Sequence, residues 1–309
     1  MIAIQHSPKS RPEKLVTSCP STLLIFTHDV RGNFCHAVLV DVEKLKQSKI
    51  ILSCQPFPWE GDWRLGEALA AGALVFQNHM VDPYPGIING ENVILYNTTA
   101  QMLTLLRWYL DHAAEADLIA QRGRALAATW TPESTVSSMI RLLEWPTTRI
   151  RVFQFPFIDA CINEEYEMMH QGLNESHLVS VVNTLHEAEL LIIDLQRLSD
   201  CGDLFKKDPT VKERAANAIK EARLAGIKTM ALDFNDKPHA LFAGTHDYYF
   251  KRSRADRGKQ TMIEYPRPDV HPIYYPVKEE WRKGLEQQPP RSARHFDVSF
   301  FFPLWRLGS

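Results

Sequence analysis

Segments typical of strands and segments typical of helices alternate along the whole chain. Short apolar runs such as residues 23–27, 49–54 and 190–194 predict buried strands, and stretches with helical spacing lie between them. This alternation favours an α/β fold with mainly parallel sheets, because parallel neighbours are joined by crossover connections that are usually helical. A chain of 309 residues, 45% of them hydrophobic, can fill one large core or two medium cores.

Residues 60–76 form the most informative single segment. The pattern predicts a loop, a short helix with Glu67 in its first turn, and a tight turn at Gly72 into the buried strand 74–76. A helix that begins after a strand directs free N–H groups and a positive dipole end outward, which makes its N-terminus a site for anions. The carboxylate of Glu67 suits a ribose diol, because it can accept two hydrogen bonds.

This segment resembles the donor-nucleotide motif of GT-B glycosyltransferases. The motif reads approximately R-x-x-E-A-x-A-x-G-x-x-V and is matched from Arg64 to Val75, and residues 49–54 and 89–93 match the same family's pattern. The resemblance implies two Rossmann-like domains that face a cleft. It also implies transfer of a sugar from a nucleotide-diphosphate donor to an acceptor hydroxyl.

The resemblance places the donor site around this motif. Glu67 would hold the donor ribose and Arg64 the diphosphate, while the loop before them would offer backbone N–H groups. The full set expected to bind the donor is Gly61, Asp62, Trp63, Arg64, Glu67, Gly72, Asn92, Lys251, Arg252 and Arg306. Each has a plainer alternative: Glu67 and Arg64 as a surface pair, Gly72 as a helix C-cap, and Asn92 as part of a turn.

The order of the two halves differs from that of the resembled family, which places its acceptor domain first. We expect residues 1–145 to form the donor domain, completed by a strand within 295–309, and residues 146–294 to form the acceptor-side domain and a linker. This arrangement would be a circular permutation, which chains tolerate where their ends are exposed and adjacent. The alternative is an ordinary chain with an additional C-terminal strand.

Three aspartates are the candidate catalytic residues of the acceptor half. Asp194 and Asp233 end predicted parallel strands, at the edge where ligands bind in open α/β sheets. Asp247 begins the run 247–252, which resembles a D-x-Y-F-K-R pattern of exostosin-like and related bacterial-type GT-B enzymes. Any of these aspartates could instead be a helix N-cap or a solvated surface group.

The sequence contains neither a D-x-D metal motif nor His residues at metal-ligand spacing. We therefore expect metal-independent chemistry without a cofactor, in which Arg, Lys and helix N-termini balance the charge of the leaving diphosphate. The nucleotide-diphosphate sugar would be a substrate, and the acceptor a glycan, a lipid or a small molecule.

Charge and cysteine content narrow the classes of partner. The balance of 35 basic and 37 acidic residues gives no overall field for nucleic acid, and no apolar run is long enough for a transmembrane helix. Five scattered cysteines without a C-x-x-C pair favour a reducing, cytoplasmic setting. Two alternatives to a transferase stay open: a non-catalytic nucleotide-sugar-binding protein, and a sugar-nucleotide epimerase of related architecture.

Two long segments are predicted to be mainly helical. One runs from a cap at Thr98 or Thr99 towards Thr129, and the other covers residues 164–187. Both show apolar residues at helical spacing and lack internal proline.

Overall fold

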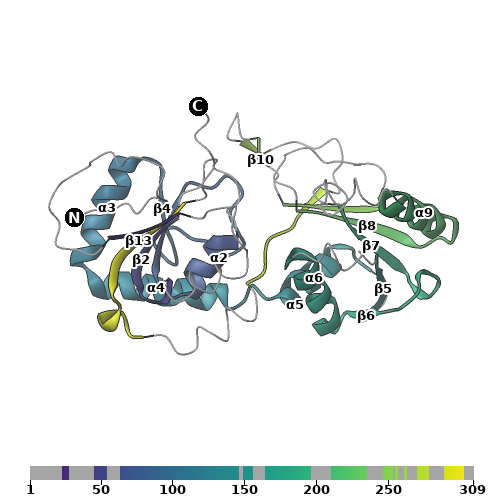
Figure 1. Cartoon of the computed structure of the whole chain (residues 1–309), viewed down its shortest axis with the longest axis horizontal. Coiled ribbons are helices and arrows are strands. Elements are labelled where there is room, and N and C mark those ends of the chain that lie inside the picture. The colour runs from purple at the N-terminus through teal and green to yellow at the C-terminus, as the bar shows by residue number, and fades with distance from the viewer. Residues whose placement is uncertain are drawn as a thin grey trace. The chain divides into compact units, whose positions relative to one another are not determined.

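The computed structural model describes residues 23–27, 45–53, 63–145, 149–155, 164–195, 210–234, 246–252, 255–256, 261–262, 270–277 and 289–302. Internal contacts divide the chain into two compact units (Figure 1). Unit 1 comprises residues 1–129 and 277–309, and unit 2 comprises residues 130–276. Each unit contains a parallel sheet with helices, so the α/β class expected from the sequence is confirmed.

The sheet of unit 1 has five described strands, and all neighbours run parallel. In spatial order they are β1 (Leu23–Thr27), β13 (Phe296–Phe302), β2 (Ser48–Ser53), β3 (Leu74–Asn78) and β4 (Ile94–Tyr96). Strand β13 lies between β1 and β2, with Val298 opposite Leu23 on one side and Ile50 on the other. The late segment 296–302 therefore shares a sheet with the early strands, as a circular arrangement requires, although the permutation itself stays a prediction.

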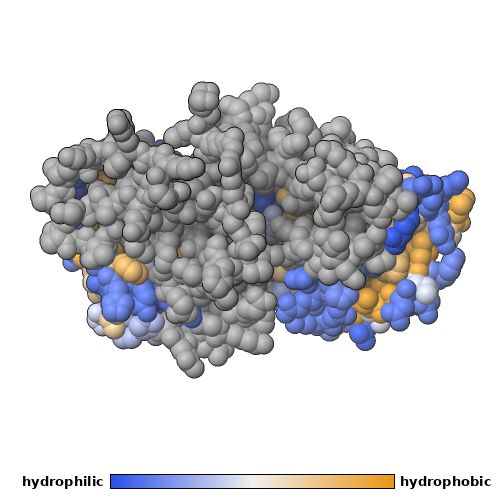
Figure 2. All heavy atoms as spheres, in the orientation of Figure 1, coloured by the Kyte–Doolittle hydropathy of each residue, from blue (hydrophilic) through white to orange (hydrophobic). Residues whose placement is uncertain are grey.

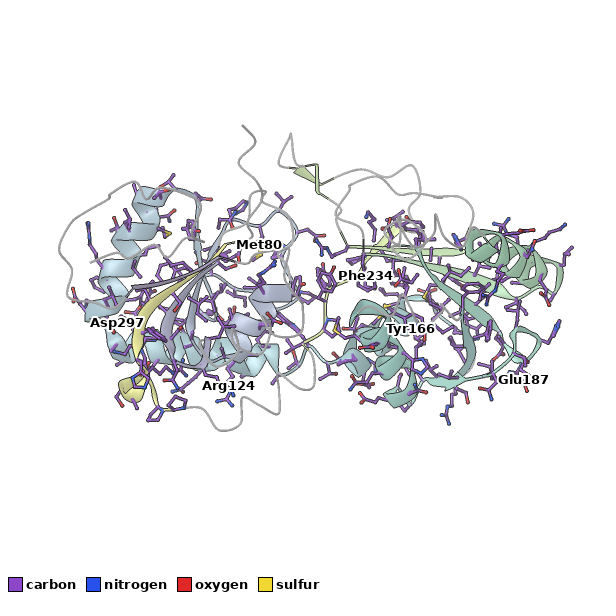
Figure 3. The ribbon with its side chains drawn as sticks, in the orientation of Figure 1. Met80, Arg124, Tyr166, Glu187, Phe234 and Asp297 are labelled. Carbon is purple, nitrogen blue, oxygen red and sulfur yellow. The ribbon has the colours of Figure 1, made fainter. Side chains whose placement is uncertain are left out.

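Polar contacts hold β13 to the first residues of β2. Ser48 and Ser299 share a buried hydrogen bond of 2.6 Å between their hydroxyl oxygens, and Lys49 Nζ lies 2.7 Å from Asp297 Oδ1. Asp297 is labelled on β13 in Figure 3. Just upstream, around the short 3₁₀ turn η3 (Arg291–Ala293), Arg294 donates to the carbonyl oxygen of Ser48 at 2.8 Å. These contacts fix the register of the two strands as well as their proximity.

Three helices complete the described part of unit 1: α2 (Trp63–Ala70), α3 (Thr99–Asp111) and α4 (Ala113–Ala127). Apolar residues of α3 and α4 join β2, β3, β4 and β13 in one core cluster, in which the ring of Tyr109 meets Phe76 edge to face at 6.0 Å. Helix α2 packs closely against α4 at Gly123. A Cβ added there would lie only 2.5 Å from Asn92 O and 2.8 Å from Leu69 Cδ2. The glycine allows this close approach.

The region from Thr98 to Thr129 is mainly helical, as predicted, but it is interrupted at His112. Thr98 does cap the first helix, since its hydroxyl accepts from Gln101 N. His112, however, leaves the helical conformation with φ −115° and ψ 60°, and its ring stacks on Trp108 with centroids 3.6 Å apart. The break separates α3 from α4 without a glycine or proline to signal it.

Unit 2 is built around a parallel sheet of six described strands. Their spatial order is β12 (Val270–Pro272), β9 (Tyr248–Lys251), β8 (Lys228–Asp233), β7 (Leu190–Asp194), β5 (Ile150–Gln154) and β6 (Val179–Val181). A small antiparallel pair, β10 (Ala255–Asp256) and β11 (Thr261–Met262), follows β9 in the chain. Strands β7 and β8 are almost entirely buried, which explains their near-continuous apolar sequence.

The helical elements of unit 2 are α5 (Pro132–Leu142), α6 (Glu164–Glu175), η2 (Leu185–Glu187) and α9 (Thr210–Leu224). Helix α5 belongs to unit 2, although its residues fall within the segment 1–145 that the sequence assigned to the donor domain. It packs on α6 at Gly172, where an added Cβ would overlap the carbonyl oxygen of Pro132.

In the segment 164–187, which the sequence predicted to be mainly helical, the α-helix ends at Glu175. The edge strand β6 and the turn η2 follow α6 instead. Residues 179–181 pair with β5 from Ile150 to Val152, and this pairing decides their conformation because three residues are too few to show a clear period in the sequence.

Candidate functional site

The carboxyl ends of the parallel strands define one edge of each sheet, and ligands of open α/β sheets bind outside this edge. In unit 1, β2 ends here at Ser53, β3 at Asn78 and β4 at Tyr96. Helix α2 follows β2 in the chain, so its N-terminus at Trp63 is directed to the same edge. The geometry is that of a strand leading to a helix N-terminus, as the sequence predicted for an anion site.

Arg64 and Glu67 both lie on α2, one turn apart. Glu67 is the fifth residue of the helix, so the prediction of an acidic residue in the first turn is wrong. Its side chain is only 4% exposed, and Arg64 is half-buried. A carboxylate in this position costs free energy unless polar partners hold it, so a role as a solvated surface pair with Arg64 fits the structure poorly.

Gly72 adopts φ +61° immediately after α2. Its N–H donates to Leu69 O and the N–H of Ala71 donates to Glu67 O, both at 2.8 Å, which ends the helix and turns the chain into β3. The left-handed conformation explains the glycine of the motif, because other residues adopt it at a cost.

Asn92 lies before the amino end of β4, away from the carboxyl edge. Its Nδ2 donates to Gly86 O at 2.8 Å, and its Oδ1 accepts from Ile88 N at 3.0 Å. These contacts stabilise the loop between β3 and β4, so they agree with the turn alternative. The expected contact of Asn92 with the donor stays a prediction.

Gln77 is a residue that the sequence interpretation missed. It lies near the carboxyl end of β3, opposite Ser53 of β2 and Leu95 of β4, and its side chain is completely buried. Its Nε2 donates to Asn78 Oδ1 at 2.7 Å, whereas its Oε1 accepts no hydrogen bond. A buried amide oxygen without a donor is costly. The signal was present in the sequence, as a polar residue at the end of an otherwise apolar strand.

The remaining donor-site predictions in this unit concern residues outside the described part of the chain. Gly61, Asp62 and Arg306 lie there entirely, and for Trp63 only the backbone at the start of α2 is described. Their expected roles stay predictions.

In unit 2, polar residues end four adjacent strands at the carboxyl edge: Gln154 on β5, Asp194 on β7, Asp233 on β8 and Lys251 on β9. All four side chains are buried. Gln154 Oε1 lies 2.8 Å from Nδ1 of His170 on α6, a pair that the sequence interpretation did not identify. Asp194 lies one strand away from Asp233, so the structure brings these two predicted residues to the same edge.

Asp233 is held on both carboxylate oxygens. Lys251 Nζ lies 3.2 Å from Oδ1, and the hydroxyl of Tyr249 donates to Oδ2 at 2.6 Å. Lys251 is 0% exposed, so its ammonium group is committed to this buried pair. This arrangement suits a structural ion pair better than a phosphate contact by Lys251.

Arg252 extends the same cluster. Its backbone N–H donates to Asp233 O at 3.0 Å, and its Nη1 donates to the hydroxyl of Tyr275 at 2.6 Å. The Tyr275 ring stacks on Phe234, the residue after β8 labelled in Figure 3, with centroids 5.4 Å apart. Arg252 is 4% exposed, so packing and hydrogen bonds position its guanidinium rigidly.

Asp247 lies at the opposite edge of this sheet, before the amino end of β9. Its Oδ2 accepts from Thr229 N at 2.8 Å, and its Oδ1 accepts from Lys228 Nζ at 3.0 Å. Burial acts to raise the pKa of this carboxyl, but the hydrogen bonds from Thr229 and the ammonium group of Lys228 outweigh it and lower the pKa below 3.8. The three predicted catalytic aspartates are therefore not brought together: Asp194 and Asp233 share one edge, and Asp247 lies at the other.

The described residues also bear on metal ions and membranes. Among those residues, no group of three or more His, Cys, Asp or Glu side chains is arranged to hold a metal ion. None of the described helices is both long and apolar enough to cross a bilayer.

Comparison with known proteins gives one match. Residues 42–141 match the model of a protein family described as "Glycosyl transferase-like". Neither the curated proteins nor the solved structures contain a significant match. The matched segment runs from before β2 to the end of α5 and includes Arg64, Glu67 and Gly72. Residues 42–141 are thus similar to a glycosyl transferase-like family, and the predicted donor motif within them lies on a buried helix at the carboxyl edge of a parallel sheet.

Proposed function

We propose that the protein is a metal-independent GT-B glycosyltransferase that moves a sugar from a nucleotide-diphosphate donor to an acceptor hydroxyl. The observation that carries this proposal is the buried carboxylate of Glu67 on α2, within a segment that matches a glycosyl transferase-like family. Two parallel sheets, one in each unit, agree with the two Rossmann-like domains that such an enzyme needs.

In the proposed donor site, Glu67 accepts hydrogen bonds from the ribose hydroxyls. Arg64 offers a forked set of donors to the diphosphate, with backbone N–H groups of residues 61–63 beside it. Arg306 would be a second contact to phosphate. These groups would stabilise the charge that develops on the leaving diphosphate as the glycosidic bond breaks. Gln77 adds an acceptor to the same edge through its unpartnered Oε1.

On the acceptor side, we propose Asp194 as the residue that positions or deprotonates the acceptor hydroxyl. It shares the carboxyl edge of the unit 2 sheet with Asp233, whose two oxygens are already held by Lys251 and Tyr249. Asp233 would therefore support the site electrostatically, and Arg252 would supply positive charge near it. Asp247 would act in folding.

We further propose that the order of the domains is circularly permuted relative to the GT-B family. Its support is the place of β13 between β1 and β2, since a strand from residues 296–302 then occupies the interior of a sheet otherwise formed by residues 23–96. In an unpermuted chain, neighbouring parallel strands of this kind are joined by a crossover connection of a dozen or more residues.

One observation favours a second function. Because the carboxylate of Asp233 and the ammonium group of Lys251 are committed to each other, the acceptor half offers few groups for chemistry. A non-catalytic protein that binds a nucleotide sugar would need only the donor site.

The first experiment measures binding of UDP, GDP, ADP and CMP by calorimetry and thermal shift. It compares the wild type with Glu67→Ala, Glu67→Gln and the matched control Glu91→Ala, which removes an exposed carboxylate of unit 1. We expect one diphosphate to bind the wild type and the control, and to bind both Glu67 variants at least about tenfold more weakly. No binding by the folded wild type would overturn the proposal.

Turnover then separates the two functions. Hydrolysis or transfer of the matching sugar nucleotide supports the transferase, and its loss in Asp194→Asn with unchanged nucleotide binding supports the role of Asp194. Tight binding without turnover supports the non-catalytic alternative.

A further inference from the structure

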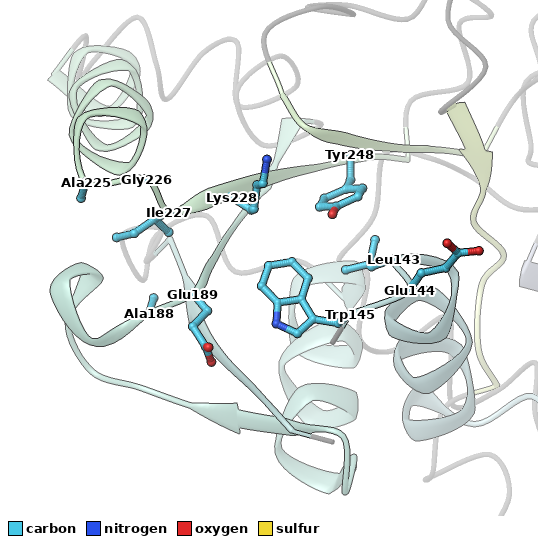
Figure 4. Close-up of a pocket in the computed structure, with 10 residues that line it drawn as sticks. All are labelled: Leu143, Glu144, Trp145, Ala188, Glu189, Ala225, Gly226, Ile227, Lys228 and Tyr248. Carbon is cyan, nitrogen blue, oxygen red and sulfur yellow. The ribbon is translucent and has the colours of Figure 1, made fainter. Parts of the chain in front are cut away.

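Unit 2 contains a pocket of about 480 Å³ that none of the predicted donor or acceptor residues lines (Figure 4). Its lining residues come from the end of α5, the segment before β7, the turn between α9 and β8, and the start of β9: Leu143, Glu144, Trp145, Ala188, Glu189, Ala225, Gly226, Ile227, Lys228 and Tyr248. A pocket of this size lies in the range of small-molecule sites.

The pocket opens at the amino edge of the sheet. Strands β7, β8 and β9 begin beside it and end at Asp194, Asp233 and Lys251. The six residues of β8 span roughly 16 Å at the usual rise of a strand. The pocket is therefore separated from the carboxyl edge of the same sheet, where the proposed acceptor chemistry takes place.

Two aromatic rings form one wall of this pocket. The rings of Trp145 and Tyr248 lie 6.4 Å apart at 54°, and the apolar side chains of Ala188, Ala225 and Ile227 also line the pocket, to the left of the rings in Figure 4. Aromatic rings together with apolar side chains suit a ligand with a flat, partly apolar ring. Trp145 and Tyr248 are both half-buried, so the fold fixes their positions while part of each side chain stays accessible to a ligand.

Two charged side chains, those of Glu189 and Lys228, also line this pocket. In Figure 4 the carboxylate of Glu189 and the ammonium group of Lys228 point in opposite directions. Glu189 Oε2 accepts from Arg151 N at 3.0 Å, and Lys228 is paired with Asp247 at 3.0 Å. The two groups are thus oriented by neighbours, and each retains capacity for further hydrogen bonds.

Strain in the backbone occurs at the same place. Glu144 has φ +49°, the one positive value among the described residues other than glycine. It follows Leu143, the C-cap of α5, and directly precedes Trp145, so this conformation sets the path that brings the indole into the pocket. The left-handed conformation is costly for residues other than glycine, and such strain is concentrated at functional sites.

We propose that this pocket binds a neutral saccharide ring, separately from the donor and acceptor sites. A pyranose presents C–H groups on its face, for Trp145 and Tyr248, and hydroxyl groups at its rim, for Glu189 and Lys228. Glu144 and Glu189 disfavour an anionic ligand, because the single ammonium group at the pocket is already paired with Asp247. The choice of a sugar rests on the proposed transferase function, for which a second site would retain a glycan product or acceptor.

The test measures binding of methyl β-D-glucopyranoside, methyl α-D-mannopyranoside and chitotriose to the whole chain by calorimetry and saturation-transfer NMR. Wild type is compared with Trp145→Ala and with the control Trp108→Ala, which removes a 49% exposed indole of unit 1 that stacks on His112. We expect millimolar or tighter binding of at least one probe, weakened about tenfold in Trp145→Ala and unchanged in the control.

Ala225→Leu provides a second variant that retains all existing packing, because Ala225 is exposed and its larger replacement narrows the pocket. It should weaken the same probe. Absence of saccharide binding by the folded wild type, or binding that both pocket variants leave unchanged, would overturn the proposal.

Nucleotide binding, measured in the same samples, keeps the two proposals apart. A donor site without a saccharide pocket would bind a nucleoside diphosphate in every variant and bind no probe through Trp145. Failure of the transferase proposal alone would abolish nucleotide binding and leave the effect of Trp145 on saccharide binding.

Discussion

The ammonium nitrogen of Lys251 lies 3.2 Å from Oδ1 of Asp233, and neither side chain is more than 1% exposed. The pair joins the carboxyl ends of β8 and β9, which are neighbours in register. Each charge compensates the desolvation of the other, so the removal of one partner leaves an uncompensated charge in the core.

Lys251→Met should therefore lower the free energy of unfolding by about 3–5 kcal/mol. Asp233→Asn should act similarly, while the double variant should lose much less than the sum of the two because no charge is left unpaired. Urea unfolding of the four proteins in this cycle gives the coupling directly. Additive losses would contradict a buried ion pair.

Asp247→Asn should lower the free energy of unfolding at neutral pH by roughly 1 kcal/mol, since the carboxylate is partly exposed and its contacts are only partly desolvated. The folded-state pKa lies below 3.8, so this contribution is present above that ordinary value and is lost as the pH falls through the folded pKa. Urea midpoints measured from neutral pH down to acid should converge for variant and wild type at low pH. The control Glu167→Gln removes an exposed carboxylate on α6, and its urea midpoint should change with pH in the same way as that of wild type.

Arg294 anchors the segment before β13 to Ser48 and Pro289 through their carbonyl oxygens. Burial, followed by the nearby charge of Arg291, lowers the pKa of Arg294 to about 10, so the guanidinium remains charged at neutral pH. Arg294→Ala should lower the free energy of unfolding by about 2–3 kcal/mol, because a charged donor to a buried carbonyl is lost. Arg122→Ala, on the exposed face of α4, should change stability by less than about 0.5 kcal/mol in the same urea assay.

Gly123→Ala and Gly90→Ala separate steric overlap from backbone strain. At Gly123 the new Cβ meets Asn92 O at 2.5 Å and Leu69 Cδ2 at 2.8 Å, and overpacking of this kind costs about 2–3 kcal/mol. At Gly90 the space around the new Cβ is open, so only the strain of an alanine at φ +78° lowers the free energy of unfolding, by about 1 kcal/mol. Thermal and urea unfolding should rank Gly123→Ala as the more damaging; the reverse order would argue against the close contact of α2 and α4.

The proposed permutation predicts that the chain can be reordered. A protein in which residues 130–309 precede residues 1–129 would place β13 before β1, joined by residues 303–309 and 1–22. We expect it to fold and to bind the same nucleoside diphosphate within about threefold of the original affinity, since no strand pairing changes. A reordered chain that folds and loses binding would contradict the proposal.

Apolar runs in the sequence were sufficient to locate most strands. Predicted strands at residues 23–27, 49–54 and 190–194 appear as β1, β2 and β7, with shifts of at most one residue. Strands buried on both faces read as continuous apolar segments, and this signal is strong. The parallel α/β class followed from their alternation with helices.

The interruptions of the two mainly helical segments have no clear signal in the sequence. The stack of Trp108 on His112 accompanies a helix break that neither glycine nor proline announces. Strand β6 is only three residues long and depends on its pairing with β5.

The separation of the predicted catalytic aspartates has a simpler cause. Asp247 precedes β9 and lies at the amino edge of the sheet, whereas Asp194 and Asp233 end β7 and β8 at the carboxyl edge. Arg64, Glu67 and Gly72 belong to one short motif, and its helix and turn were predictable because they are local structures. Their role in donor binding stays a prediction.

The position of β13 also bears on how the protein is synthesised. Ser48 and Ser299 are 251 residues apart, so the interior of the unit 1 sheet cannot close until residues 296–302 have left the ribosome. Unit 2 lies on one continuous stretch and can fold while synthesis continues, whereas β1 and β2 wait with unpaired edges. During this interval the apolar strands 23–27 and 48–53 lack their partner β13, and unpaired strand edges are prone to aggregation.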